Sequence, residues 1–248
     1  MKLVIINGSP RGKESNSNVI TNWIATGIVK STQVNKISAI KTDFQRGAKD
    51  STKIIESMQL DKFYTANINT HREAVDSIED NSTVVVVFPL YGDAMPAITK
   101  LFFEELEIIA NKKENVKMYY IVHSGFKGAN HCRAVERYLV YLTDYLGFKY
   151  MGTAIKPGSE GLRLTPVENL LDFTNDFYSL SKDIAKGSDF DVNTLKRLVG
   201  FEFPSEEYKI GIKQSNGNTG YFSRILKQNN AFTKCFDKPY QRKSKKSY

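Results

Sequence analysis

Segments typical of β-strands alternate with segments typical of α-helices five times along residues 1–186. The strand-like segments are residues 2–7, 34–40, 82–88, 117–123 and 150–155. Three of them are nearly continuous runs of apolar or β-branched residues, which is typical of parallel strands covered by helices on both faces. Strands that alternate with helices in this way form right-handed βαβ units. The pattern therefore predicts an α/β fold with a doubly wound, five-stranded parallel sheet.

Apolar residues at helical spacing predict the helices between these strands. The stripe after the first strand is Val19, Ile20, Trp23, Ile24 and Ile28, and the stripe after the third is Ile98, Leu101, Phe102, Leu106 and Ile109. The predicted stripe after the fourth strand is Ala134, Tyr138, Leu142 and Tyr145. Residues 41–81 are too many for one helix and its two loops. We expect short helices at 51–58 and 71–78, with an irregular insert at 60–69.

The length allows either one large α/β domain with a full core or a domain of about 190 residues plus an appendage. A chain of 248 residues can bury a full core, and 41% apolar with 25% charged residues is ordinary for a soluble globular protein. We predict a domain over residues 1–187 and a C-terminal extension over 188–248. No segment approaches the ~20 apolar residues that a membrane span needs, so we expect a cytoplasmic protein. Two isolated cysteines, Cys132 and Cys235, exclude a disulfide framework and an all-cysteine metal site.

The net charge of +8 is concentrated near the C-terminus. Residues 187–248 hold 12 Lys and Arg against 6 Asp and Glu, a net charge of +6, and the last ten residues carry four positive charges and no negative one. A basic tail can contact nucleic acid or an anionic membrane, but solvated charge at a frayed terminus is commoner. The extension also lacks the interleaved aromatic and basic residues of single-strand binders. We therefore expect no nucleic-acid partner.

The loop GSPRGKESNSN, residues 8–18, lies between the first predicted strand and the first predicted helix. A helix that follows such a loop presents unpaired N–H groups and a positive dipole end that suit a phosphate. Arg11 can add paired, charge-assisted hydrogen bonds, and the two glycines permit a tight backbone turn. Further side-chain donors are Ser9, Ser15, Asn16 and Ser17. The loop predicts a phosphate-monoester site, and the alternative is a polar loop that caps a helix.

Several common site motifs are missing from the sequence. Neither G-x-G-x-x-G nor G-x-x-x-x-G-K-[ST] follows the first strand, which excludes the usual dinucleotide and nucleoside-triphosphate loops. The three histidines, His71, His123 and His131, occur in no metal or triad motif. We therefore predict no metal site and no acid–base catalytic residue.

The loop GSPR followed by SNS resembles the phosphate loop of the NADPH-dependent FMN reductases, flavoproteins of the flavodoxin-like fold. Residues 89–106 resemble the second flavin loop of that family with its following helix, and residues 123–148 are similar to the third loop and fourth helix. The resemblance covers about residues 1–186. It implies the strand order 2-1-3-4-5, with FMN bound where the strand order reverses.

The resemblance also implies which residues bind the cofactor. The FMN phosphate would be held by Ser9, Arg11, Ser15, Asn16 and Ser17. The isoalloxazine ring would be lined by Pro89, Leu90, Tyr91, Gly92 and Asp93 on one flank, and by Ser124, Gly125 and Phe126 on the other. Flat apolar contacts and backbone donors suit a flavin, and a Pro-Leu-Tyr-Gly turn supplies both. The alternative for Tyr91 is a position in the core.

The resemblance implies an FMN-dependent oxidoreductase that takes hydride from NAD(P)H and passes electrons to flavin, quinone or another small acceptor. FMN performs the redox step, so no protein side chain is nominated as catalytic. The alternative is a non-enzymatic electron carrier like the flavodoxins, which are acidic and have a Thr-rich phosphate loop; the charge of +8 and Arg11 favour the reductase. Many relatives are homodimers. Some carry iron–sulfur clusters on cysteines between the second and third strands, and residues 41–81 contain no cysteine.

Overall fold

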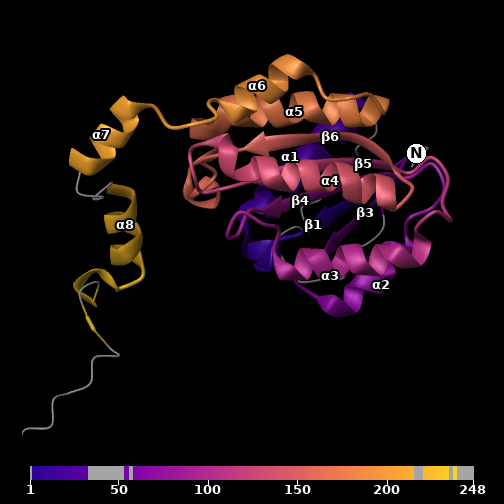
Figure 1. Ribbon diagram of the computed structural model, residues 1–248, viewed down its shortest axis with the longest axis horizontal. Coiled ribbons are helices and arrows are strands. Elements are labelled where there is room, and N and C mark those ends of the chain that lie inside the picture. Colours follow the sequence, from indigo (N-terminus) through magenta and orange to yellow (C-terminus); the bar gives the residue numbers. More distant parts are fainter. Residues whose placement is uncertain (1, 33–52, 56–57, 215–219, 235–236, 239–248) are drawn as a thin grey trace, which may run out of the picture. The chain divides into compact units, whose positions relative to one another are not determined.

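The structure is a computed structural model that describes residues 2–32, 53–55, 58–214, 220–234 and 237–238. The chain divides into two compact units, Met1–Phe203 and Pro204–Tyr248 (Figure 1). The first unit contains the sheet and its covering helices. It therefore holds all the residues that the sequence nominates for a site.

One sheet forms the centre of the first unit. Its strands are β1 (Lys2–Asn7), β2 (Lys53–Ile55), β3 (Met58–Tyr64), β4 (Thr83–Pro89), β5 (Lys117–His123) and β6 (Lys149–Lys156). Within the described residues the spatial order is β2-β3-β1-β4-β5-β6, with β2 antiparallel to β3 and all other pairs parallel. The five parallel strands confirm the predicted flavodoxin-like order 2-1-3-4-5. The short strand β2 is an additional edge strand of the sheet, which the sequence did not predict.

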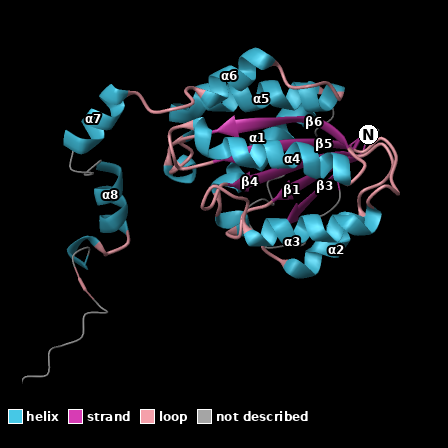
Figure 2. Cartoon of the chain, viewed as in Figure 1, coloured by secondary structure: helices cyan, strands magenta, loops and turns pink. Residues whose placement is uncertain are grey.

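Helices cover both faces of the sheet, as Figure 2 shows. They are α1 (Asn16–Ser31), α2 (His71–Asp76), α3 (Ala97–Leu106), α4 (Arg133–Tyr145), α5 (Leu171–Lys186) and α6 (Val192–Val199). One core contains Leu3 and Ile5 of β1 with residues of α1, α5 and α6, and the other contains Val4 and Ile6 with residues of α2, α3 and α4. Successive strand residues thus enter opposite cores, which explains the uninterrupted apolar runs.

The second strand of the parallel sheet is not where the sequence placed it. The predicted strand 34–40 lies outside the described residues, and β3 occupies the position beside β1. The predicted insert at 60–69 is wrong for the residues that belong to β3, and the predicted helix at 51–58 is wrong for Lys53–Ile55, which form β2. The predicted helix at 71–78 is confirmed by α2.

The charged residues of β3 explain why it does not look like a buried strand in the sequence. Asp61 and Lys62 are both buried. Lys62 Nζ donates to Asn18 Oδ1 at 2.8 Å and to Asn22 Oδ1 at 2.7 Å, both on α1. Side chains from other elements therefore provide the hydrogen bonds that make these polar residues compatible with a buried strand.

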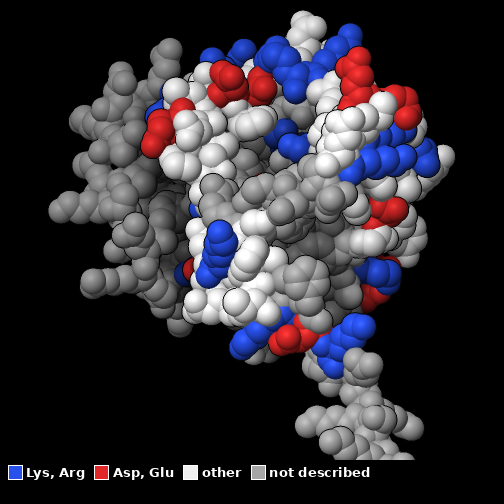
Figure 3. Space-filling view, turned by 90° about the vertical axis from the view of Figure 1, so that its left-hand side faces the viewer, with Lys and Arg blue, Asp and Glu red and all other residues white. Residues whose placement is uncertain are grey.

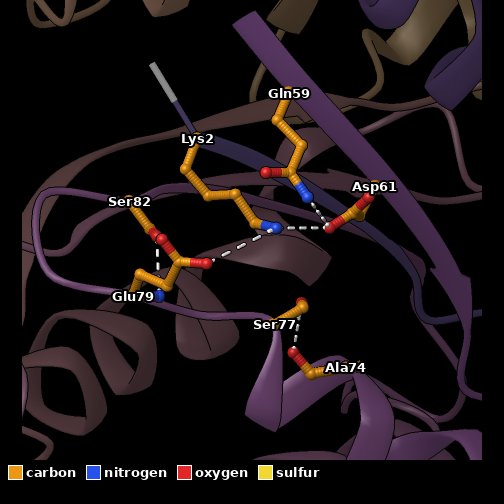
Figure 4. Close-up of polar contacts among 7 residues, drawn as sticks. All are labelled: Lys2, Gln59, Asp61, Ala74, Ser77, Glu79 and Ser82. Atoms are coloured by element: carbon orange, nitrogen blue, oxygen red, sulfur yellow. Dashed lines mark hydrogen bonds and ion pairs between the residues drawn. The ribbon is translucent and has the colours of Figure 1, made fainter. Parts of the chain in front are cut away.

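On the other side of β3, Asp61 pairs with the first residue of β1 (Figure 4). Lys2 Nζ lies 2.6 Å from Asp61 Oδ2, and the two side chains are only 10% and 7% exposed. The second carboxylate neighbour of Lys2 is more distant, with Glu79 Oε1 at 3.9 Å. Within the described part of the chain, Asp61 Oδ1 is buried and has no hydrogen-bond partner. The pair is therefore a buried ion pair with one oxygen left uncompensated.

Helix α4 buries a different face from the predicted one. Val135 and Leu139 are buried, whereas Tyr138 and Tyr145 are 46% and 63% exposed. Two apolar stripes run side by side along this helix, one aliphatic and one rich in tyrosine. The aliphatic stripe faces the sheet because it can be fully desolvated, while a tyrosine hydroxyl needs a polar partner or water.

The first unit extends beyond the domain boundary predicted at residue 187. Phe190 and Leu198 belong to the same core as α1 and α5, and α6 packs on β6. After α6 the chain passes beside the loop that follows β5. There the backbone N–H groups of Ala129 and Asn130 donate to the carbonyl oxygens of Phe201 and Glu202, at 3.1 Å each. The compact unit ends only at Phe203.

The second unit contains α7 (Glu206–Gln214) and α8 (Gly220–Gln228). None of its residues whose burial is described is buried. None of the helices described in either unit has the length and apolar character that a bilayer crossing requires.

Candidate functional site

The loops that follow β1, β4, β5 and β6 enclose a cavity of about 230 Å³ at the carboxyl ends of the strands. The cavity is lined by Ser9, Arg11, Ser15, Asn16, Pro89, Leu90, Tyr91, His123, Ser124, Gly125, Ser159 and Glu160. This is the ligand-binding edge of an open parallel sheet. Figure 3 shows the molecule turned by 90° from the view of Figure 1, and on the face that it presents basic and acidic side chains are interspersed.

The loop after β1 is held in place by Asn7, the last residue of that strand. Asn7 Oδ1 accepts from the backbone N–H of Ser9 at 3.0 Å, and Asn7 Nδ2 donates to Gly12 O at 3.1 Å. Gly12 has a φ of +51°, which lies in the left-handed region that favours glycine. Ser15 caps α1 by accepting from Asn18 N at 3.1 Å. The loop is therefore shaped before any ligand binds.

The hydrogen bonds of this loop determine which donors remain for an anion. Ser15 Oγ donates to Gly12 O at 2.6 Å, and Asn16 Nδ2 donates to Ser159 O at 2.9 Å, so both side chains are committed. The backbone N–H groups of Asn16 and Ser17 lie in the first turn of α1, where no helical carbonyl can accept from them. Arg11 is exposed, and no ion pair of it occurs among the described residues.

The loop after β4 presents Tyr91 to the cavity. Tyr91 and Ala94 exchange two backbone hydrogen bonds, of 2.9 and 3.2 Å, across Gly92 and Asp93. These two central residues have φ values of +57° and +58°, the geometry of a tight type I′ turn. The Tyr91 side chain is 48% exposed, so it is not a core residue.

The loop after β5 is tied to the loop after β4 by His131. The ring of Phe126 stacks on His131 with centroids 4.4 Å apart, and His131 Nδ1 lies 3.0 Å from Asp93 Oδ1. Phe126 is 57% exposed and offers an uncovered aromatic surface. This contact joins the two loops. The exposed rings of Tyr91 and Phe126 form an aromatic rim next to the cavity.

The structure brings most of the nominated residues to this one edge. Ser9, Arg11, Ser15, Asn16, Pro89, Leu90, Tyr91, Ser124 and Gly125 line the cavity. Ser17, Gly92, Asp93 and Phe126 do not line it. Ser17 is fully buried, and its Oγ lies 2.7 Å from His123 Nε2.

Sequence reasoning missed His123, Ser159 and Glu160 as lining residues. His123 is the last residue of β5, and Ser159 and Glu160 follow the end of β6. Their positions at strand ends were available as a signal, because the carboxyl ends of parallel strands meet at one edge. Burial lowers the pKa of His123 to about 3, so the imidazole is neutral at physiological pH.

Lys156, the last residue of β6, contacts the loop after β5 through its backbone. Its carbonyl accepts from Ser124 N at 3.1 Å. Its buried ammonium donates to Pro157 O at 2.9 Å and lies 4.3 Å from the centroid of the Phe173 ring. Burial, together with the nearby Lys127, lowers the pKa of Lys156 to about 8.

We expect Lys156→Met to raise the free energy of unfolding at pH 7 by up to about 3 kcal/mol, because the shift from 10.5 to about 8 measures what burying the charge costs. Between pH 8 and 10.5 the unfolded chain binds a proton that the folded chain does not, so the parent gains stability as the pH rises. The advantage of the variant should therefore vanish above pH 10.5. Urea titrations at pH 7 and 10.5 measure the free energy of unfolding of the parent and of the variant. Lys182→Met, at an exposed position, is the control. An advantage independent of pH would contradict the prediction.

Comparison with known proteins agrees with this architecture. The model of the family described as "Flavodoxin-like fold" matches residues 1–162. The chain belongs to this family. The resemblance found in the sequence is thus confirmed at the level of the fold. No curated protein matches the chain.

Solved structures of the same fold are distant in sequence. An oxidoreductase from Corynebacterium diphtheriae is 11% identical, with a TM-score of 0.50 over 75% of this chain and 96% of that one. An NADH:FMN oxidoreductase in its apo form is 12% identical over 83% and 97% of the two chains, with a TM-score of 0.49. An FMN-dependent NADH-azoreductase from Bacillus anthracis in complex with FMN is 14% identical over 74% and 99%, with a TM-score of 0.48.

Proposed function

We propose that this chain is an FMN-dependent oxidoreductase that takes hydride from NAD(P)H and passes electrons to flavin, quinone or another small acceptor. One observation carries the proposal. The loop with the first-turn N–H groups of α1 and with Arg11, which forms no ion pair among the described residues, meets two loops with exposed aromatic rings at one cavity. Phosphate and isoalloxazine are the two ends of FMN, and this edge has surroundings for each.

The residues present fit FMN at its phosphate end. At Gly8 an added Cβ would lie 2.7 Å from Phe88 Cβ, so the start of the loop packs too closely on β4 for a side chain. Arg11, the Ser9 hydroxyl and the first-turn N–H groups of α1 are the donors left for the phosphate. Ser15 and Asn16 would act through their backbone, because their side chains already hold the loop.

The ring end fits as well. Leu90 is 8% exposed and Tyr91 48% exposed, so the second loop offers one apolar and one aromatic wall. The backbone of Gly125, which lines the cavity, would face the polar edge of the ring. The cavity is smaller than the 300 Å³ or more typical of pockets that enclose a whole ligand, so part of the flavin would face the rim at Phe126.

In this proposal the protein binds and orients FMN and shields it from water, while the bound FMN would supply the transfer of hydride and electrons. Neutral His123 places no cation beside the ring. The aromatic rim of Tyr91 and Phe126 would exclude water from one face and provide a stacking surface for a planar acceptor. A homodimer and a cytoplasmic location remain predictions of the sequence.

An absorbance spectrum before and after anaerobic addition of NADPH or NADH tests the proposal. We expect flavin bands in protein loaded with FMN, and we expect them to bleach with the nicotinamide. Bands that stay unchanged with both nicotinamides would favour the electron carrier. A protein that retains no FMN after gel filtration would contradict both.

We expect Arg11→Ala to weaken FMN binding by about tenfold or more, because a charge-assisted hydrogen bond contributes about 1.5–3 kcal/mol. Riboflavin lacks the phosphate, so its affinity should be unchanged. Arg137→Ala removes another exposed arginine, on α4, and should change neither affinity. Fluorescence titrations with both flavins measure the dissociation constants. Equal FMN affinity in the parent and Arg11→Ala would remove Arg11 from the site.

A further inference from the structure

His123 joins two serines from segments far apart in the sequence. Its Nε2 lies 2.7 Å from Ser17 Oγ on α1, and its Nδ1 lies 2.8 Å from Ser159 Oγ in the loop after β6. Ser17, His123 and Ser159 are at most 3% exposed. The three side chains therefore form a buried hydrogen-bonded chain that crosses the carboxyl edge of the sheet.

The hydrogen bonds around Ser159 determine the tautomer of the imidazole. Ser159 Oγ lies 2.9 Å from Ser124 O, and a carbonyl oxygen can only accept. The single hydroxyl proton of Ser159 is thus committed, and Ser159 must accept from His123 Nδ1. Neutral His123 then carries its proton on Nδ1, and its Nε2 accepts from the hydroxyl of Ser17.

This assignment changes the role that Ser17 can have. Its only hydroxyl proton points to His123, so its side chain has no proton for a phosphate. Among the described residues, the backbone N–H of Ser17 in the first turn of α1 has no hydrogen-bond partner, and neither has the neighbouring N–H of Asn16. His123 therefore acts on the anion-binding end of α1 through Ser17.

A second pair of contacts reinforces the same connection. Asn16 Nδ2 donates to Ser159 O at 2.9 Å, and Asn16 Oδ1 accepts from Arg163 N at 3.0 Å. The first turn of α1 is thus joined both to the end of β5, through His123, and to the loop after β6, through Asn16.

We propose that His123, as the Nδ1–H tautomer, is a positioning residue that fixes the first turn of α1, and with it the N–H groups that would receive the FMN phosphate. This inference rests on the proposed function. Without the bond to His123, the Ser17 side chain loses its connection to β5, and the first turn of α1 is held by the contacts of Ser15, Asn16 and Asn18.

Two amide variants separate the two hydrogen bonds of His123. In His123→Gln the amide oxygen can reach the place of Nε2 and accept from Ser17. In His123→Asn the shorter amide can reach only the place of Nδ1 and donate to Ser159. We expect FMN affinity within threefold of the parent for Gln, and about tenfold weaker for Asn and for Ser17→Ala. Riboflavin affinity should be the same in all four proteins.

The tautomer can be measured without any flavin. In ¹⁵N-labelled protein the imidazole signals that disappear in His123→Gln belong to His123. We expect the pattern of the Nδ1–H tautomer, unchanged from pH 8 to pH 5. An Nε2–H pattern, or a titration near pH 6.5, would overturn the inference.

The binding outcomes distinguish the inference from the proposed function. A parent that binds no FMN overturns the proposed function, and the role of His123 toward the phosphate with it. A parent that binds FMN, with Asn and Gln variants of equal affinity, overturns the inference alone. Losses of the same size for FMN and riboflavin also overturn it, because they indicate a structural role without relation to the phosphate. Thermal melts of each variant verify that the fold is retained.

Discussion

Replacing Lys2 by Met is expected to lower the free energy of unfolding by about 3–5 kcal/mol, which is typical when one partner of a buried ion pair is removed. Asp61 would remain in a site that is 7% exposed, with its nearest cation gone. One of its oxygens already has no partner among the described residues. Met keeps the length and most of the apolar contacts of the lysine stem, so the loss reports mainly the uncompensated carboxylate.

Two further variants isolate this effect. The double variant Lys2→Met with Asp61→Leu removes both charges and should recover most of the lost stability, since a buried pair contributes little over an apolar replacement. Arg72→Met breaks the exposed pair with Asp76, whose side chains are 57% and 59% exposed, and should cost no more than about 0.5 kcal/mol. Urea unfolding provides all four values. A loss below about 1 kcal/mol for Lys2→Met would mean that water reaches Asp61.

The ion pair also explains which part of the fold could be predicted from the sequence. Strands β1, β4 and β5 are uninterrupted apolar runs, and their predicted limits agree with the structure to within one residue. Several residues of strand β3 are also buried. Because two of them are the charged residues Asp61 and Lys62, the sequence pattern assigned this segment to an insert. The side chains that satisfy these charges, Lys2 and Asn22, lie in other elements, and no local pattern reveals them.

The same reasoning applies to the site. The rule that loops at the carboxyl ends of parallel strands bind ligands predicted the loops after β1, β4 and β5 correctly as neighbours of one cavity. It did not predict the hydrogen bond between His123 and Ser17, because these two residues are 106 positions apart in the sequence. Nor could it predict that the side-chain amide of Asn16 donates its hydrogen bond to Ser159 O rather than to a ligand. Sequence indicates which side chains are near the site, whereas the hydrogen bonds decide which donors are left for a ligand.

The domain boundary was placed too early for a related reason. Gly187 ends α5 with a left-handed φ of +66°, a typical helix stop, and the residues after it are rich in charge. A helix stop is not a domain boundary when the following segment returns to the core. Gly152 in β6, with a φ of +126°, leaves room for this return, since an added Cβ would lie 3.1 Å from the Phe190 ring. Chain length and composition carry no signal for such a return.

A chain that ends at residue 187 is therefore expected to lose about 5 kcal/mol or more of unfolding free energy, whereas a chain that ends at Phe203 should match the full protein. The shorter chain lacks Phe190 and Leu198, which are 5% and 2% exposed, and burying each such side chain contributes about 1.5–3 kcal/mol. It also uncovers Tyr119, whose ring centroid lies 5.1 Å from that of Phe190 and whose hydroxyl donates to Ser188 O at 2.8 Å.

Because whole domains are typically stable by about 5–15 kcal/mol, the chain ending at 187 should be largely unfolded or aggregated at 37 °C. The chain ending at Phe203 keeps both cores and the ion pair of Arg133 with Glu202, and it loses no described residue that is buried. Urea unfolding followed by circular dichroism compares the three chains, and Leu198→Ala in the full chain gives the contribution of one core residue, about 2–5 kcal/mol. Equal unfolding midpoints for the chains ending at 187 and 203 would show that α6 adds nothing to the core, against its position on β6.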